Sequence, residues 1–171
     1  GSYTVSLKVT DAQGNSNTKT IENMVTVVDD CPNCISYGNM DYATAVTLVN
    51  FNEINNATGK EAPYTDYSND ISTTVETGDS HNLTVNVNTD GNYTVYAKAW
   101  VDWNQDLDFD DSNEEYDLGF ATNTADGPTD LSPLTITIPQ NALNGSTTMR
   151  VSAKYNGTPT PCETNFDGEV E

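Results

Sequence analysis

An acidic stretch near the middle of the sequence has the residue types and the spacing of a calcium-binding loop. Half of the sixteen residues from Asp102 to Asp117 are Asp or Glu, and none is Lys or Arg. Calcium takes roughly six to eight oxygen ligands, which tight loops supply from alternate positions. Directly after a predicted strand, oxygen-bearing side chains recur at this spacing and a glutamate closes the series: Asp102, Asn104, Asp106, Asp108, Asp110 and Glu114, or Glu115 in its place. We therefore predict a calcium site here, with a structural role.

One residue in this series counts against a standard calcium loop. Leu107 stands at the sixth position from Asp102, where such loops usually turn sharply at positive φ and a branched side chain is strained. Either the loop follows a different path, or it binds calcium weakly. Magnesium suits the series less well, because it keeps its waters and accepts few protein ligands. The alternative to a calcium site is an ordinary solvated acidic loop.

The sequence lacks the common signatures of catalysis. It contains no G-x-S-x-G or H-E-x-x-H motif, and its only histidine is His81. Paired carboxylates can hydrolyse glycosides, but carboxylates clustered on one loop are neutralised by the ion that they bind. A zinc site is not expected either, because Cys31 and Cys34 would need two further good ligands. We therefore expect a protein that is not an enzyme and has no catalytic residues.

The charge of the chain restricts its partners. The formal net charge is −20, from 26 acidic and 6 basic residues among 171. Such a field repels phosphate backbones and anionic lipids, so nucleic acid is not an expected partner. No apolar run approaches the roughly 20 residues that cross a bilayer, so membrane insertion is not expected. Divalent cations and neutral ligands are the partners that this charge favours.

Short strands separated by turn residues run through the whole sequence. At the start, Tyr3, Val5, Leu7 and Val9 alternate with polar residues, and a second predicted strand follows the turn DAQGNS. Five further segments have the composition of strands: YATAVTLVNF, GDSHNLTVNVN, GNYTVYAKAWVDW, LSPLTITIPQ and STTMRVSAKY. No segment carries a convincing helical apolar stripe. We predict an all-β protein with an antiparallel sandwich of the jelly-roll or immunoglobulin-like type.

The composition indicates an extracellular protein, either secreted or on the cell surface. Asn, Thr, Asp, Ser and Gly are abundant and Lys and Arg are scarce, which is typical of extracellular β-rich modules. In that setting three cysteines, Cys31, Cys34 and Cys162, predict one long-range disulfide to Cys162. The residue pattern leaves open whether its partner is Cys31 or Cys34.

Two predicted strands carry aromatic and basic residues on their polar faces. Alternation places these residues opposite the apolar faces: Tyr96, Lys98 and Trp100 in one strand, and Arg150 and Lys154 in the other. If the strands are neighbours, the five side chains form a platform on which sugar rings stack and basic groups bind hydroxyls or anions. The alternative is that a loop covers the aromatic rings while acidic residues pair with the basic ones. Further candidate contacts are the tyrosines of the 37–67 region: Tyr37, Tyr42, Tyr64 and Tyr67.

Two parts of the sequence resemble known families. Residues 1–29, with YTVSLKVTDAQGN, resemble the last two strands of a PKD domain, an immunoglobulin-like sandwich of bacterial secreted enzymes. Residues 34–171 resemble the GEVED domain of secreted Bacteroidetes proteins, through blocks that include WVDWNQDLDFDD at 100–111, MRVSAKYNGTPTPCE at 149–163 and GEVE at 168–171. We therefore assign 1–29 to a PKD-like domain and 30–171 to a GEVED-like sandwich. Because the family continues beyond GEVE with a last strand, one sheet edge is expected to lack a partner.

The resemblance implies an accessory module attached to a catalytic domain of the parent chain, or to an adhesin. It also favours Cys34 as the partner of Cys162. Together with the aromatic and basic platform, it predicts a non-catalytic, monomeric module that binds a polysaccharide, such as a marine or plant glycan. The alternative is a structural spacer or a protein-interaction module of a secreted protease or adhesin.

Overall fold

The structure is a computed structural model that describes residues 2–26 and 34–171. The chain divides into two compact units, Gly1–Cys31 and Pro32–Glu171. Each unit is described by itself, beginning with the smaller one.

The first unit contains an antiparallel hairpin of β1 (Ser2–Thr10) and β2 (Ser16–Thr26). Asp11 fixes the turn, because its Oδ1 accepts the backbone N–H groups of Gln13 and Asn15 at 3.0 and 2.8 Å. The two strands expected from the alternating pattern are therefore present. A single hairpin occurs in many β folds, and it does not show a PKD domain.

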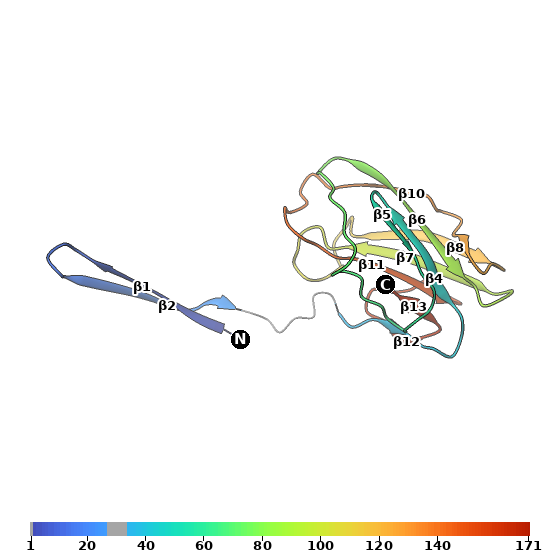
Figure 1. Ribbon diagram of the computed structural model, residues 1–171, viewed down its shortest axis with the longest axis horizontal. Coiled ribbons are helices and arrows are strands. Elements are labelled where there is room, and N and C mark those ends of the chain that lie inside the picture. Colours follow the sequence, from blue (N-terminus) through green and yellow to red (C-terminus); the bar gives the residue numbers. More distant parts are fainter. Residues whose placement is uncertain (1, 27–33) are drawn as a thin grey trace. The chain divides into compact units, whose positions relative to one another are not determined.

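The second unit is a sandwich of two antiparallel sheets (Figure 1). The first sheet has the order β10-β6-β4-β5, with β9 paired to β6, and the second has the order β13-β11-β7-β8. The strands of the first sheet are β4 (Ala45–Phe51), β5 (Ile54–Ala57), β6 (Ser80–Asn88), β9 (Gly127–Pro128) and β10 (Leu134–Thr137). Those of the second are β7 (Thr94–Val101), β8 (Glu115–Thr122), β11 (Met149–Tyr155) and β13 (Gly168–Val170). The described residues include no helix, and hence none that is long and apolar enough to cross a membrane. The predicted all-β sandwich is confirmed.

Alternation along the strands produces the core between the two sheets. In β6, every second residue from Leu83 onward is buried, and the residues between them are half-buried. One buried cluster joins residues of the two sheets: Val46 and Val49 of β4, Val85 and Val87 of β6, Val95, Ala97, Ala99 and Val101 of β7, and Val151 and Ala153 of β11. Strand β7 departs from this alternation at Trp100, which is buried although it lies on the outer face.

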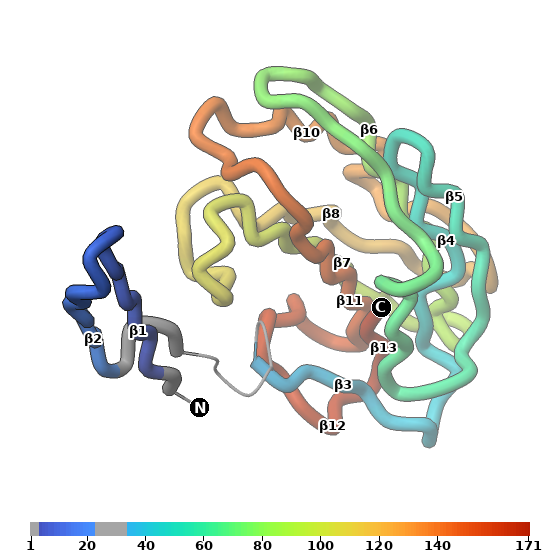
Figure 2. Tube along the Cα trace, turned by 60° about the vertical axis from the view of Figure 1, so that its left-hand side comes forward, coloured from blue at the N-terminus to red at the C-terminus, as the bar shows by residue number. Residues whose placement is uncertain are grey.

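A small parallel pair, β3 (Tyr37–Gly38) with β12 (Thr164–Phe166), lies beside β13 (Figure 2). On the side of β13 away from β11, the N–H of Val170 donates to the carbonyl of Pro63 at 3.3 Å, and its carbonyl accepts the N–H of Thr65 at 3.0 Å. The expectation that a sheet edge lacks a partner is therefore wrong at β13. The segment around residues 63–65 pairs with this strand and covers its edge.

A disulfide joins Cys34 to Cys162 across a sequence separation of 128 residues, with 5.3 Å between the Cα atoms. Of the two partners that the residue pattern leaves open, Cys34 is the bonded one, which is the pairing that the resemblance implies. Cys31 lies outside the described residues. The bond ties the start of the sandwich to the segment that leads into β12.

Candidate functional site

The predicted calcium loop is the connection between β7 and β8. The backbone N–H of Val101 donates to the carbonyl of Glu114 at 3.0 Å, which closes the base of the loop. Asp102 lies just above this base and is 3% exposed. Its two carboxylate oxygens accept the backbone N–H groups of Asp106 and Leu107 at 3.2 and 3.1 Å. The first predicted ligand therefore folds the loop back on itself.

Three further side chains of the loop accept hydrogen bonds from the backbone two residues ahead. The Oδ1 atoms of Asn104, Asp106 and Asp108 accept the N–H groups of Asp106, Asp108 and Asp110 at 3.1, 3.3 and 2.9 Å, respectively. Such a succession of Asx turns winds the backbone tightly. Leu107 takes a positive φ of 76°, the conformation that glycine adopts most easily. The loop thus makes a sharp turn at this position in spite of the leucine.

Three carboxylates of the loop lie close enough together to hold one ion. Oxygens of Asp106, Asp108 and Asp111 lie within 4.8 Å of one another, and all three residues are exposed. Asn104 connects two of them, because its Nδ2 donates to Asp106 at 2.8 Å and to Asp111 at 2.7 Å. Strict alternation in the sequence predicts Asp110 instead of Asp111. The turns of the loop bring the neighbouring carboxylate into the group, which no spacing rule signals.

Glu114 is the buried member of the loop. It is 2% exposed, and its Oε1 accepts the backbone N–H of Trp103 at 2.8 Å, while its Oε2 is buried and has no hydrogen-bond partner. Burial raises the pKa of Glu114, backbone hydrogen bonds lower it, and the charges of Asp102 and Asp106 raise it further. Glu114 and Asp111 line the same cavity of about 120 Å³. A buried carboxylate oxygen without a donor is the environment that a cation or a proton satisfies.

The five residues of the predicted platform lie together on the outer face of the second sheet. Strands β7 and β11 are neighbours, and their register forms three cross-strand pairs: Trp100 with Arg150, Lys98 with Ser152, and Tyr96 with Lys154. Strand β8 extends these rows on the other side of β7 with Glu115, Asp117 and Phe120, in the same order. The rows differ in how far they are open to solvent.

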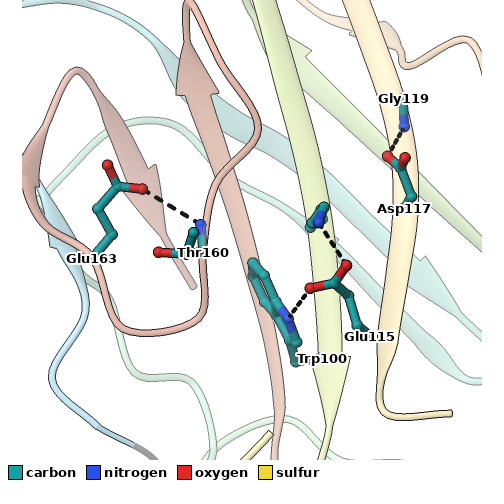
Figure 3. Close-up of polar contacts among 7 residues, drawn as sticks. Trp100, Glu115, Asp117, Gly119, Thr160 and Glu163 are labelled. Atoms are coloured by element: carbon teal, nitrogen blue, oxygen red, sulfur yellow. Dashed lines mark hydrogen bonds and ion pairs between the residues drawn. The ribbon is translucent and has the colours of Figure 1, made fainter. Parts of the chain in front are cut away.

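The row that contains Trp100 is closed to ligands. Trp100 is 0% exposed, and its Nε1–H donates to Glu115 at 3.2 Å (Figure 3). The centroid of the Phe109 ring, which comes from the acidic loop, lies 6.4 Å from the centroid of the Trp100 ring. The guanidinium of Arg150 lies 5.2 Å from the centre of the Phe109 ring, and its Nη1 donates to the carbonyl of Pro161 at 2.7 Å. The prediction that Trp100 contacts a ligand is therefore wrong, and Arg150 is held in internal contacts. Strand periodicity assigns a face, but it does not show what packs over that face.

The two lysines of the face are held in ion pairs. Lys98 pairs with Glu115 at 2.6 Å, and Lys154 pairs with Glu163. The backbone N–H of Thr160 also donates to Glu163, at 3.4 Å (Figure 3). The side chains of Lys98 and Lys154 keep 15% and 21% of their surface exposed. Both lysines lie beside the open part of the face, and their ion pairs hold them in position.

The open part of the face is an aromatic pair. Tyr96 is half-buried and Phe120 is 42% exposed, with ring centroids 5.8 Å apart and planes tilted by 49°. The platform predicted from the sequence does not include Phe120. An irregularity in the pairing of β7 with β8 separates the Lys98–Asp117 pair from the Tyr96–Phe120 pair, so that Phe120 joins the outer face three residues after Asp117. Gly119, with a positive φ of 72°, is the sequence signal of that bulge.

The loop tyrosines are divided between exposed and partly covered positions. Tyr37, Tyr42 and Tyr64 are 38%, 54% and 43% exposed, whereas Tyr67 is half-buried. Two other apolar residues of the same region, Ile35 and Met40, are 65% and 53% exposed. This region therefore carries a second group of exposed apolar and aromatic side chains, apart from the face of β7, β8 and β11.

A comparison with protein families finds a match in the second half of the chain. The family model of the GEVED domain matches residues 96–171, which run from β7 to the end of the chain and include the acidic loop, the aromatic pair and the GEVE segment. The GEVED domain is a family of small accessory domains. No curated protein and no solved structure matches the chain.

Proposed function

We propose that residues 32–171 form a non-catalytic accessory module of a secreted multidomain protein, which binds a polysaccharide on the outer face of β7, β8 and β11. A calcium ion in the 102–114 loop stabilises the fold beside this face. The match to a family of small accessory domains supports the accessory role.

The open aromatic pair is the observation that carries the proposal. Tyr96 and Phe120 present ring surface on an antiparallel sheet, and sugar rings stack on such surfaces. Lys98 and Lys154 lie next to the pair, and each is positioned by a glutamate. A lysine held in place can donate to a sugar hydroxyl or to an acidic sugar without losing much rotamer freedom.

The net charge of −20 narrows the class of glycan. A strongly anionic polysaccharide would be repelled by most of the surface, although the two lysines beside the aromatic pair would attract it at this face. Neutral plant or marine glycans meet no such repulsion. We therefore expect neutral glycans to bind at ordinary salt, and anionic glycans to bind less tightly.

Affinity electrophoresis and calorimetry against a panel of plant and marine polysaccharides test the proposal. At least one neutral glycan should retard the protein, and Phe120→Ala and Tyr96→Ala should each weaken the binding by about tenfold, as stacking contacts usually do. Tyr42→Ala is the matched control, because Tyr42 is also an exposed aromatic residue, at 54%, but lies outside this face. If no glycan is retarded, with or without calcium, or if the two variants bind as tightly as the wild type, the proposed site is wrong.

A second function is supported by a different surface. The exposed side chains of Ile35, Tyr37, Met40 and Tyr42 are apolar or aromatic and follow one another within eight residues. Such a group favours contact with another protein domain, as in a structural or adhesion module. Cross-linking of the module to its attached domain in the parent chain, compared with Ile35→Ser and Met40→Ser, separates this role from glycan binding.

A further inference from the structure

The GEVE segment places two carboxylates inside the sandwich. In the register of β13 with β11, Glu169 lies opposite Ala153, and Val151 exchanges backbone hydrogen bonds with Glu171 at 2.8 and 2.9 Å. Ala153 and Val151 belong to the buried core. Residues that are directly opposite on paired strands point to the same face. Both glutamates therefore project toward the interior, between the two sheets.

Glu169 is fully buried, and one of its oxygens has no partner. Its Oε2 accepts the backbone N–H of Val46 in β4 at 3.1 Å, while its Oε1 is buried without a hydrogen bond. Strand β4 has a bulge at this position, between Val46 and Leu48. The carboxylate thus reaches across the interior to an irregular point of the opposite sheet.

Glu171, two residues after Glu169, also has one carboxylate oxygen that is hydrogen-bonded and one that is not. Its Oε1 accepts the hydroxyl of Thr58 at 2.6 Å, and its Oε2 is buried without a partner. Thr58 lies next to β4, because its N–H donates to the carbonyl of Thr47 at 3.0 Å. Val46 and Thr47 are adjacent in the chain, so the two carboxylates meet neighbouring points of the opposite sheet.

A third oxygen comes from the segment that covers the edge of β13. The parallel bridge between Tyr64 and Val170 sets the next residue, Thr65, alongside Glu171. Its Oγ1 is also buried, and the hydroxyl of Tyr67 is close enough to interact with it. Two unpartnered carboxylate oxygens, from Glu169 and Glu171, and the hydroxyl oxygen of Thr65 thus come from neighbouring positions of two paired segments.

In the described part of the chain, no ion pair compensates these buried carboxylates. Among residues 2–26 and 34–171, the ion pairs are Lys98 with Glu115 and Lys154 with Glu163. Lys60 is near enough for its charge to lower the pKa of Glu169, but its ammonium donates to the carbonyl of Tyr42 at 2.8 Å. Buried charge that is neither paired nor fully hydrogen-bonded is strongly destabilising. Either a cation or protons must therefore neutralise the pair.

We propose that Glu169, Glu171 and Thr65 bind a divalent cation between the two sheets, at a site separate from the acidic loop. All three ligands are oxygens, which calcium and magnesium prefer and which suit zinc and copper less well. Of the two, calcium accepts the irregular geometry that protein side chains impose, whereas magnesium keeps several waters. We therefore expect this site to bind calcium. This site does not depend on glycan binding, so either proposal can fail without the other.

Calcium binding to the chelator-treated chain tests the proposal by calorimetry. Glu169→Gln and Glu171→Gln each remove one negative charge from the proposed ligands. Each should weaken calcium binding at the site between the sheets by at least about tenfold and leave binding at the acidic loop unchanged. Glu61→Gln is the matched control, since it makes the same change at an exposed residue whose charge also acts on Glu169. A loop variant, Asp106→Asn with Asp108→Asn, should keep the site that the glutamate variants lose.

Thermal melting supplies a second readout, including for variants that bind too weakly for calorimetry. In chelator, Glu169→Gln should melt above the wild type, because the amide can be buried without taking up a proton, and added calcium should raise its midpoint less than that of the wild type. Thr65→Val, which keeps the side-chain shape, covers the case in which a glutamine variant does not fold. The proposal is overturned if the glutamine and valine variants bind as much calcium as the wild type. It is also overturned if calcium raises the melting midpoint of the glutamine variants as much as that of the wild type. In either case protons, and not a cation, neutralise the two carboxylates.

Discussion

At the scale of single residues, Leu107 is a strained position of the acidic loop. This leucine has a positive φ of 76°, and its side chain is 45% exposed. In this conformation a residue with a Cβ atom is destabilised by roughly 1–2 kcal/mol relative to the right-handed helical conformation. Because the Leu107 side chain is largely exposed, its packing offsets little of this destabilisation. The leucine is therefore a cost to the loop that a glycine would remove.

Leu107→Gly should raise the free energy of unfolding by about 1 kcal/mol, because the strain disappears and exceeds the greater entropy of glycine in the unfolded chain. Urea denaturation in calcium measures the change. Leu143→Gly is the control, since Leu143 is 57% exposed but is not among the residues with positive φ. A loss of stability in Leu107→Gly as large as that in the control would contradict the explanation.

Two adjacent aspartates give the sharpest test of the calcium loop. Asp111 belongs to the group of close carboxylates, and Asp110 does not. Asp111→Asn should therefore weaken calcium binding by about tenfold or more, whereas Asp110→Asn should change it by less. Both substitutions remove one charge from the same loop, so the long-range electrostatic effect is equal. Calorimetric titration of the two variants decides, and a greater loss in Asp110→Asn would favour the simple alternating ligand set.

At the scale of elements, Phe109 connects the acidic loop to the sheet. It is 6% exposed, and its ring lies against Trp100 of β7 and under the guanidinium of Arg150 of β11. An ion that fixes the loop would thereby fix the aromatic ring over two neighbouring strands. The loop and the outer face of the sheet should therefore respond together when calcium is removed.

Phe109→Ala should lower the free energy of unfolding by about 3 kcal/mol, because a buried aromatic side chain is lost. It should also expose Trp100 to solvent, which shifts tryptophan fluorescence to longer wavelength. Phe120→Ala, at a residue that is 42% exposed, should cost under about 1 kcal/mol and leave the emission unchanged. Unchanged emission in Phe109→Ala would mean that another group covers Trp100.

At the scale of the whole molecule, the buried carboxylates make the stability of the metal-free protein depend on pH. Burial raises the pKa of Glu169 to about 8 and that of Glu171 to about 7, from an ordinary value of 4.5. Between these values the folded protein keeps protons that the unfolded chain has released. The free energy of unfolding is therefore highest below about pH 4.5 for this pair and falls as the pH rises through 7 and 8.

Urea denaturation in chelator between about pH 5 and pH 8 measures this dependence. The wild type should lose stability across the range, and the double variant Glu169→Gln with Glu171→Gln should lose less, because its amides do not titrate. The double variant also corrects for the general repulsion of a chain with net charge −20. Equal slopes for the two proteins would show that the carboxylates do not titrate in this range.

The alternation of apolar and polar residues predicted which face of each strand a side chain lies on. The alternation of TVYAKAWV and MRVSAKY correctly placed Tyr96 and Lys154 on one face, and the two strands are neighbours as that face required. The burial of Trp100 could not be predicted, because its cover, Phe109, comes from a loop whose path has no period. GEVE likewise shows an alternating pattern, but polar residues normally point outward, so nothing local places Glu169 inside.

The disulfide between Cys34 and Cys162 has a consequence for mechanical load. If a parent chain is stretched from both sides of the sandwich, tension that enters at Cys34 passes through the sulfur bridge directly to Cys162. From there the tension runs through β12 and β13. The residues between the two cysteines do not carry it, and these include β7, β8 and the acidic loop. The face and the loop would keep their shape while neighbouring domains are pulled apart, until the short terminal strands or the bridge itself give way.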